Sequence, residues 1–267
     1  MKNKLPISLC VIAGAEARRV GKCLDSAAEW TSEIVVVLNP EVTDGTDEIA
    51  AKHGARVVRH PFANFRDQKN FALEQASQPW ILSLDADEAV SPELRMAIFD
   101  FFAREPEKFA GAQFPRKTWF LGRWITHGDW YPDRVLRLFQ KAKGKWGGGS
   151  PEHCAVELTG LCATLGADLL HYSNPTISSY VGKINYFADA HLERQLQKGA
   201  HWSAASAITR AAWRFVRAYF LRAGFLDGYP GFFIASSTAY STLVRHSRLF
   251  EHERQTKAQT CEPAKSH

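Results

Sequence analysis

The first ninety residues alternate between short apolar runs and segments with helical spacing, and this alternation constrains the fold more than any other feature. Apolar runs typical of strands occur at residues 7–12, 33–38, 56–59 and 80–84. Segments with helical spacing lie between them, at residues 18–28, 46–53 and 66–76. Near-continuous Val, Ile and Leu are typical of parallel strands covered on both faces. The pattern predicts a Rossmann-like α/β sheet flanked by helices, with ligands at the carboxyl ends of the strands.

The rest of the chain has a different pattern. Residues 109–173 contain short β-like runs between Gly, Trp and Pro, and the chain from residue 177 onward has helical spacing. We therefore expect one domain over residues 1–175, with halves at 1–108 and 109–175. A helical extension over 176–253 and a disordered, polar tail over 254–267 would follow.

The N-terminal segment, MKNKLPISLCVIAGAEA, has two interpretations. Its basic start, apolar run and Ala-Gly-Ala triplet resemble a signal peptide. We favour the first strand of the sheet, because a helix-length segment and the run EIVVVL follow as a βαβ unit requires. No apolar segment approaches the roughly 20 residues of a membrane span. The five cysteines form no C-x-x-C pair, so neither a disulfide framework nor a zinc site is indicated.

Three acidic residues crowd the end of the fourth predicted strand, in the stretch WILSLDADEAVSPEL. In an extended segment Asp85 and Asp87 point the same way, and two carboxylates about 5 Å apart repel by roughly 3 kcal/mol at an effective dielectric of 20. Helix capping does not explain them, because Ser91 followed by a proline fills that role. A divalent cation, Mg²⁺ or Mn²⁺, would relieve the repulsion. The alternative is a solvated acidic turn.

Several stretches resemble family 2 glycosyltransferases of the GT-A fold, and more narrowly the lipopolysaccharide core β-1,4-glucosyltransferase group. In chain order the stretches are EIVVV with TDGTDEIA, FRDQKNFALEQA, WILSLDADEAVSPEL, FLGRWITHGDWYPDRVLRLF, LLHYS and WRFVRAYFLRAGFLDGYPGFF. Together they cover most of residues 5 to 250. The resemblance implies a GT-A mixed sheet with a nucleotide-sugar half over 1–108 and an acceptor half over 109–175. It also implies transfer of a sugar from a nucleotide diphosphate to an acceptor hydroxyl, with inversion.

The resemblance assigns the metal and part of the donor site. The D-x-D motif of the family falls on Asp85 and Asp87, which would bind the cation that neutralises the leaving diphosphate. Glu88 would orient the donor or the metal-bound waters, and the alternative is an acid in the first turn of a helix. His153 is expected to contact the metal or phosphate, and the alternative is a hydrogen-bonded structural histidine.

Inversion in one displacement requires a carboxylate base near the acceptor hydroxyl. The candidates after the fourth strand are Asp129, Asp133, Glu152 and Glu157. We expect Glu152, which stands in a Glu-His pair that the related group has as His-Glu, to be the base, with Asp133 as the second candidate.

Further contacts with the donor are expected from Asn39, Arg66, Lys69 and Arg134. The family usually places an Asp that contacts the base after the second strand, and Asn39 stands there in this chain. For the two residues at 66 and 69 the alternative is a solvated helix face. For Arg134 the alternative is a salt bridge to its neighbours. If the run YPDRVLRLF is a strand, Arg134 and Arg137 face opposite sides, so at most one of them points into the cleft.

Trp130 and Tyr131 are the expected acceptor contacts, because aromatic rings stack on sugars. The alternative is packing in the wall of the cleft.

Positive charge is concentrated late in the chain. The net charge is +5 overall, yet residues 194–226 hold six Lys or Arg and no Asp or Glu. Arg210, Arg214 and Arg217 share a helix face and would contact anionic lipid. An ordinary amphipathic helix is the alternative, and nucleic acid is not expected because no binding motif accompanies the charge. We expect a cytoplasmic protein, peripheral on the inner face of the cytoplasmic membrane.

The expected function is a metal-dependent inverting glycosyltransferase with a UDP-sugar donor and a saccharide or lipid-linked acceptor, in lipopolysaccharide core or other cell-envelope glycan synthesis. A nucleotidyltransferase is one alternative, and it would release pyrophosphate instead of a nucleoside diphosphate. The other is a non-catalytic binding module on a decayed glycosyltransferase, which would turn over no sugar nucleotide.

Overall fold

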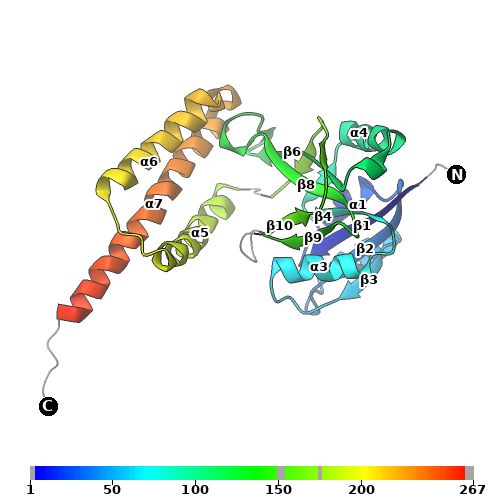
Figure 1. Cartoon of the computed structure of the whole chain (residues 1–267), viewed down its shortest axis with the longest axis horizontal. Helices are drawn as coiled ribbons and strands as arrows, with labels where there is room; N and C mark the ends of the chain where they lie inside the picture. The colour runs from blue at the N-terminus through cyan, green and yellow to red at the C-terminus, as the bar shows by residue number, and fades with distance from the viewer. Residues whose placement is uncertain (1–3, 149–153, 174–175, 262–267) are drawn as a thin grey trace, which may run out of the picture. The chain divides into compact units, whose positions relative to one another are not determined.

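The computed structural model describes residues 4–148, 154–173 and 176–261 (Figure 1). The chain divides into two compact units. Unit 1 comprises Met1–Thr118 and Asp133–Ser173, and unit 2 comprises Trp119–Pro132 and Asn174–His267. The segment 119–132 therefore groups with the C-terminal helices, although its first two residues end one strand of the sheet and another strand begins at Asp133.

Unit 1 begins with the predicted parallel strands. These are β1 (Leu5–Ala13), β2 (Thr31–Leu38), β3 (Arg56–Arg59) and β4 (Trp80–Asp85), in the spatial order β3-β2-β1-β4. The connecting helices are α1 (Val20–Asp25), α2 (Thr46–Lys52) and α3 (Phe65–Gln75). All four predicted strands are confirmed, and β1 lies in the middle of the parallel part, between β2 and β4.

The sheet continues beyond β4 with strands of mixed direction. Next come antiparallel β8 (Asp133–Gln140), then β6 (Gly111–Phe120), β12 (Leu169–His171) and β5 (Glu88–Val90). Also present are α4 (Pro92–Ala103), β11 (Cys162–Thr164) beside β6, and the pair β9 (Gly144–Gly147) and β10 (Ala155–Leu158). The predicted class, an α/β mixed sheet of GT-A type flanked by helices with a C-terminal helical extension, is confirmed.

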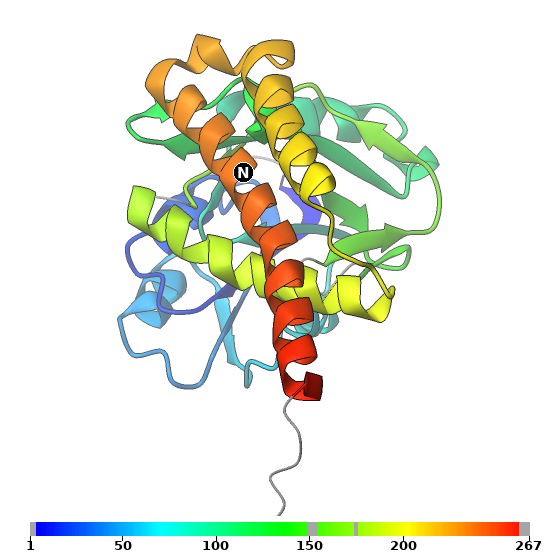
Figure 2. The same cartoon turned by 90° about the vertical axis from the view of Figure 1, so that its left-hand side faces the viewer.

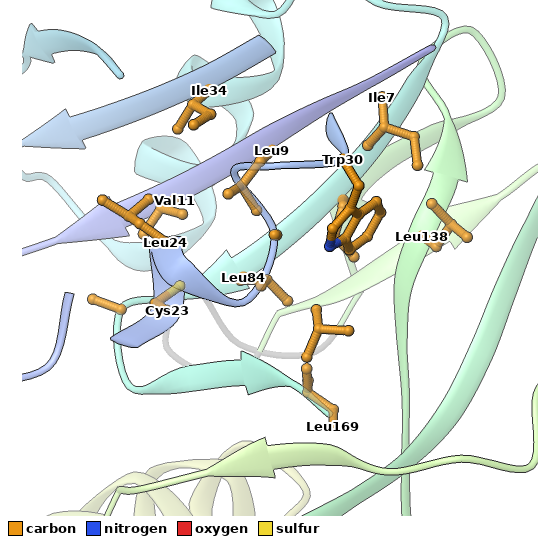
Figure 3. Close-up of a cluster of buried hydrophobic side chains, with 14 of the residues drawn as sticks. Ile7, Leu9, Val11, Cys23, Leu24, Trp30, Ile34, Leu84, Leu138 and Leu169 are labelled. Carbon is orange, nitrogen blue, oxygen red and sulfur yellow. The ribbon is translucent and has the colours of Figure 1, made fainter. Parts of the chain in front are cut away.

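The core of unit 1 lies on both faces of the sheet. Alternate residues of β1 point to opposite faces, so Leu9 and Val11 pack with Leu24 and Trp30 on one face (Figure 3). On the other face, the core cluster contains Cys10 together with residues of β2 and α3. Burial on both faces explains the continuous apolar runs of these strands.

Unit 2 contains the helices α5 (Ile177–Gln197), α6 (Ala204–Val216) and α7 (Gly228–Cys261). The short helices η3 (Arg217–Leu221) and η4 (Gly224–Asp227) connect α6 to α7. The helices α6 and α7 run side by side (Figure 2). The loop 119–132 is attached to them by Asp227, whose buried carboxylate accepts hydrogen bonds from the backbone N–H groups of Thr126 (3.1 Å) and His127 (2.8 Å).

The C-terminal helix is longer than expected. We expected a disordered tail from residue 254, but α7 continues to Cys261. Residues 254–261 contain neither Gly nor Pro, so nothing in the sequence interrupts the helix before the proline at position 263.

Candidate active site

The acidic stretch lies where β4 ends and β5 begins. Asp85 is the last residue of β4, Glu88 is the first of β5, and Asp87 lies in the turn between them. The side chain of Ser91 accepts a hydrogen bond from the Leu94 N–H (3.0 Å) and caps α4, as predicted. The carboxylates are therefore available for other contacts at the carboxyl end of a parallel strand.

Two cations hold the Asp85 carboxylate. Lys69 Nζ lies 2.7 Å from Oδ1, and Arg137 Nη2 lies 2.8 Å from Oδ2. Burial alone would raise the pKa of Asp85, but Lys69 and Arg137 hold it well below its usual range. Both cations also lie over the ring of Trp146, at 4.3 and 5.2 Å from its centroid. Asp85 is thus a fixed anion in an ion-paired cluster.

Glu88 is fully buried and bridges two arginines. Its Oε1 accepts hydrogen bonds from Arg116 and Arg137, each at 2.8 Å, and its Oε2 accepts one from the backbone N–H of Asp85 (3.1 Å). Burial opposes ionisation, yet the arginines keep the pKa of Glu88 below its usual value. The alternative of a first-turn helix acid is wrong, because Glu88 lies in β5, before α4 begins. In this structure Glu88 positions the arginines.

Asp87 has a different environment. His171 Nε2 lies 3.7 Å from its Oδ1, and Arg19 Nη1 lies 3.9 Å from its Oδ2. Burial, together with the charges of Asp85 and Glu88, raises the pKa of Asp87 to about 6. The Tyr172 N–H donates to the Asp87 carbonyl oxygen (2.8 Å), which fixes this turn beside β12. Asp87 therefore carries negative charge that its protein neighbours compensate poorly.

His171 is the residue best placed to share a cation with Asp87. It stands opposite Glu88 in the register of β12 and β5. Burial and the nearby Arg116 lower the pKa of His171 to about 4, so its ring is neutral at pH 7, as a metal ligand must be.

The acidic stretch fits a divalent cation only in part. Within residues 4–148, 154–173 and 176–261, no three His, Cys, Asp or Glu side chains are arranged to hold a metal ion. Asp85 is a poor ligand here, because both of its oxygens contact cationic side chains. The Asp87 carboxylate suits Mg²⁺ or Mn²⁺ if diphosphate oxygens and water supply most of the other ligands, whereas the neutral imidazole of His171 is a softer donor that suits Mn²⁺ better than Mg²⁺. His153, the expected third metal contact, lies outside the described residues.

The strand β8 contributes a residue that the sequence did not single out. Arg137 is buried and binds both Asp85 and Glu88, whereas Arg134 is exposed. At most one of the two was expected in the cleft, and the structure brings Arg137 to the carboxylates. Asp133 accepts hydrogen bonds from Arg116 Nε (3.0 Å) and Nη2 (2.6 Å). Thus Asp133 joins the same ion-paired cluster.

The remaining predicted contacts lie in several places. Lys69, on α3, is buried in its ion pair, and Arg66, on the same helix, is half-buried. Trp130 belongs to unit 2, where the centroid of its ring lies 5.2 Å from the ring centroids of both Phe120 and Tyr180. Tyr131 also belongs to unit 2. Glu152, the expected base, lies outside the described residues.

Two of the three arginines of the predicted membrane face form ion pairs within unit 2. Asp129, with only 5% of its side chain exposed, lies 3.2 Å from Arg214, 3.2 Å from Arg217 and 3.6 Å from Arg222. Arg214 and Arg217, expected to form a lipid-binding face, are thus ion-paired with an acid that is distant in sequence, while 39% and 32% of their side chains remain exposed. Arg210 is exposed, and its Nε donates to Ser206 (2.9 Å). None of the helices that the structure describes is both long and apolar enough to cross a membrane.

The model of the glycosyl transferase family 2 matches residues 8–159, more than half of the 267 residues. The chain belongs to this family. It is 27% identical to the lipopolysaccharide core biosynthesis glycosyltransferase LpsC of Rhizobium meliloti over 257 residues, which cover 94% of each chain. It is also 27% identical over 254 residues to an uncharacterized glycosyltransferase of Rickettsia typhi, covering 92% of this chain and 87% of the relative. Among solved structures, S. aureus TarS 1-349 in complex with UDP-GlcNAc aligns over 94% of this chain and 92% of its own, with 14% identity and a TM-score of 0.48.

Proposed function

We propose that this glycosyltransferase is metal-dependent and inverting, and that it moves a sugar from a nucleotide diphosphate, a UDP-sugar, to a saccharide or lipid-linked acceptor. The observation that carries the proposal is the pair of Asp87 and His171, placed 3.7 Å apart at the carboxyl end of β4. An undercompensated carboxylate beside a neutral imidazole is suited to a divalent cation. The similarity to LpsC over nearly the whole chain supports a role in lipopolysaccharide core or other cell-envelope glycan synthesis.

The side chains around Asp87 and His171 would have different roles in donor binding. A cation at Asp87 and His171 would supply charge neutralisation for the diphosphate leaving group. Arg19, whose Nη1 is 3.9 Å from Asp87, is near enough to bind an outer phosphate oxygen. Lys69 and Arg137 keep Asp85 ionised and fixed, and that anchors the turn carrying Asp87. The protein thus prepares a rigid site for a polyanion.

Inversion requires a carboxylate that removes the proton of the acceptor hydroxyl. Glu152 is our first candidate and Asp133 the second. The Asp133 carboxylate lies 2.6 Å from Arg116 Nη2, and this ion pair fixes its position.

Unit 2 is proposed to contact the inner face of the cytoplasmic membrane, with an apolar tip in place of the expected arginine face. The tip is the turn from η3 through η4 to the first residues of α7, where large apolar side chains are exposed: Phe220, Leu221, Phe225, Leu226, Tyr229 and Phe232. Trp213 and Arg210 of α6 are exposed as well. Exposed aromatic and aliphatic groups next to basic residues favour the interface of an anionic bilayer.

Donor binding is tested by calorimetry of the full chain with UDP-, GDP-, ADP- and CMP-sugars, each with and without Mn²⁺. We expect binding of a UDP-sugar that strengthens with Mn²⁺, and release of UDP once an acceptor is present. Release of pyrophosphate would instead support a nucleotidyltransferase. Absence of binding for every donor would support a non-catalytic module and contradict the proposal.

A further inference from the structure

Three half-buried side chains lie close together in unit 2, where α7 packs against α5 (Figure 2). They are His191 of α5 and the neighbouring pair Arg245 and His246 of α7, and together they are called the junction cluster. The two imidazole rings lie edge to face, with their centroids 5.9 Å apart. Because the rings belong to different helices, the packing of α5 on α7 holds the cluster together.

Two buried polar atoms of the junction cluster have no hydrogen-bond partner. They are Arg245 Nε and His191 Nε2, neither of which meets a donor or an acceptor among the described residues. By contrast, Arg248, one turn further along α7, lies 3.5 Å from Asp189 and 2.9 Å from Glu251. Buried polar atoms normally have a partner, so the two unpaired atoms indicate a place for a ligand.

The junction cluster is surrounded by positive charge. Burial lowers the pKa of Arg245, of His191 and of His246, and nearby cations lower each pKa further. Besides Arg245 itself, the cations that act on the cluster come from the two neighbouring helices: Arg194 and Lys198 of α5, and Arg210 and Arg214 of α6. Like charges held this close repel one another, and an anion between them would relieve the repulsion.

The acids of unit 2 leave this charge in excess. Residues 119–132 and 176–261 contain twelve Lys or Arg and six Asp or Glu. Glu193 is exposed on α5. The other five acids bind groups outside the junction cluster in the part of the chain that the structure describes: Asp129, Asp189, Asp227, Glu251 and Glu253. Unit 2 therefore has positive charge available for an anionic ligand.

We propose that the junction cluster binds a phosphate group, carried by a lipid headgroup or by a soluble phosphorylated molecule. A phosphomonoester has nearly two negative charges and three strong acceptor oxygens, so it can accept hydrogen bonds from a guanidinium and from protonated imidazoles together. Its charge also favours the protonated form of both histidines. The site is separate from the proposed donor site, because its residues all belong to unit 2 and it needs neither a nucleotide nor a divalent cation.

The first test is the binding of inorganic phosphate to the full chain, without nucleotide or metal. Titration calorimetry gives the affinity, and the rise in Tm on adding phosphate, taken for each variant against its own phosphate-free sample, separates binding from stability. Arg245→Gln should weaken phosphate binding by at least about tenfold, because a charge-assisted hydrogen bond is lost. His191→Gln, a second variant on the other helix, should weaken it by about threefold or more.

The matched control is Arg248→Gln, the same substitution one turn further along α7. It removes an equal charge from an arginine that Asp189 and Glu251 already neutralise, so the phosphate affinity should stay within about threefold of the wild type. An equal loss of affinity in Arg248→Gln and Arg245→Gln would mean that net charge alone attracts phosphate, and that result would overturn the inference.

The second test distinguishes the two sources of the phosphate. Co-sedimentation compares phosphatidylcholine vesicles that contain phosphatidic acid, a phosphomonoester, with vesicles that contain phosphatidylglycerol. Loss of the extra binding to phosphatidic acid in Arg245→Gln would assign the site to a lipid headgroup. Loss of inorganic phosphate binding alone would assign it to a soluble phosphorylated molecule. If the wild-type chain binds neither probe, or if Arg245→Gln binds both as the wild type does, the inference is wrong.

Discussion

The carboxylates of Asp85 and Asp87, separated by a single alanine, have opposite electrostatic environments. Asp85 is held at 2.7 and 2.8 Å by Lys69 and Arg137, whereas among the described residues the cationic or imidazole groups closest to Asp87 lie 3.7 and 3.9 Å away. Burial and its acidic neighbours raise the pKa of Asp87, while the two cations lower that of Asp85. The two acids of the motif therefore have different roles: Asp85 stabilises the ion-paired cluster, and Asp87 is available to bind a ligand.

This difference predicts opposite changes in stability. Asp85→Asn leaves buried cations without their partner and should cost about 3 kcal/mol. Asp87→Asn removes a buried like charge and should raise Tm by about 2–4 °C at pH 8 in EDTA. Thermal and urea unfolding of both variants measure these effects. Equal destabilisation by the two substitutions would contradict the assignment.

His171 is predicted to bind the cation with Asp87. His171→Gln should weaken Mn²⁺ binding in the presence of UDP by at least about tenfold, because the imidazole ligand beside Asp87 is lost. Titration calorimetry or the Mn²⁺ electron paramagnetic resonance signal measures it. His53→Gln is the matched control, since His53 contacts Asp25 and the Ile49 carbonyl oxygen at the end of α2. An unchanged Mn²⁺ affinity in His171→Gln would remove this residue from the site.

Arg137 is predicted to be the cation on which the acidic cluster depends. Arg137→Met leaves the buried Glu88 with one cationic partner and Asp85 with Lys69 alone, so it should cost about 3–5 kcal/mol. The control is Arg134→Met, the same change at an exposed position of the same strand, expected to cost about 0.5 kcal/mol or less. Urea unfolding distinguishes them, and similar costs at both positions would refute the prediction.

Glu33 is predicted to make stability depend on pH. Burial would raise its pKa, but hydrogen bonds from Ser77 and Ser8 outweigh it and hold the pKa below 4.5. A lowered pKa stabilises the fold above the unfolded value and loses that effect as pH falls through the folded value. The free energy of unfolding of the wild type should exceed that of Glu33→Gln by about 1–2 kcal/mol at pH 7. This difference should shrink below about pH 4.5. A difference independent of pH would contradict this.

Membrane contact is predicted to depend on the apolar tip of unit 2. The pair Leu221→Gln with Phe225→Gln should reduce binding to phosphatidylglycerol vesicles by at least about tenfold, since two large apolar groups no longer leave water. Co-sedimentation measures the bound fraction. The control pair is Met96→Gln with Leu161→Gln, which changes two large exposed apolar residues of unit 1. Comparable losses in both pairs would mean that the tip is not the contact.

The sequence was sufficient for the features that are encoded locally. Apolar runs and their spacing identified β1 to β4, and Ser91-Pro92 identified the start of α4. The position of Asp85 and Asp87 at the end of β4 followed from the same pattern.

Contacts between distant segments could not be predicted in this way. Arg116, Arg137 and His171 reach the carboxylates only through the pairing of β6, β8, β12 and β5, and no local pattern specifies that pairing. Alternation indicated that at most one of Arg134 and Arg137 faces the site, but choosing between them required the register. Likewise, the arginines of α6 read as a lipid-facing row because Asp129 is remote in sequence.

The contact of Asp227 with the loop 119–132 has a consequence for biosynthesis. Asp227 accepts hydrogen bonds from the backbone N–H groups of His127 and Thr126, which lie 100 and 101 residues earlier in the chain. During translation this loop leaves the ribosome well before its partner, and its ordering has to wait for the C-terminal helices. A ribosome stalled before residue 227 would expose Thr126 and His127 with unpaired N–H groups. The parallel strands β1 to β4 have all been synthesised by then, so the loop would become ordered after them.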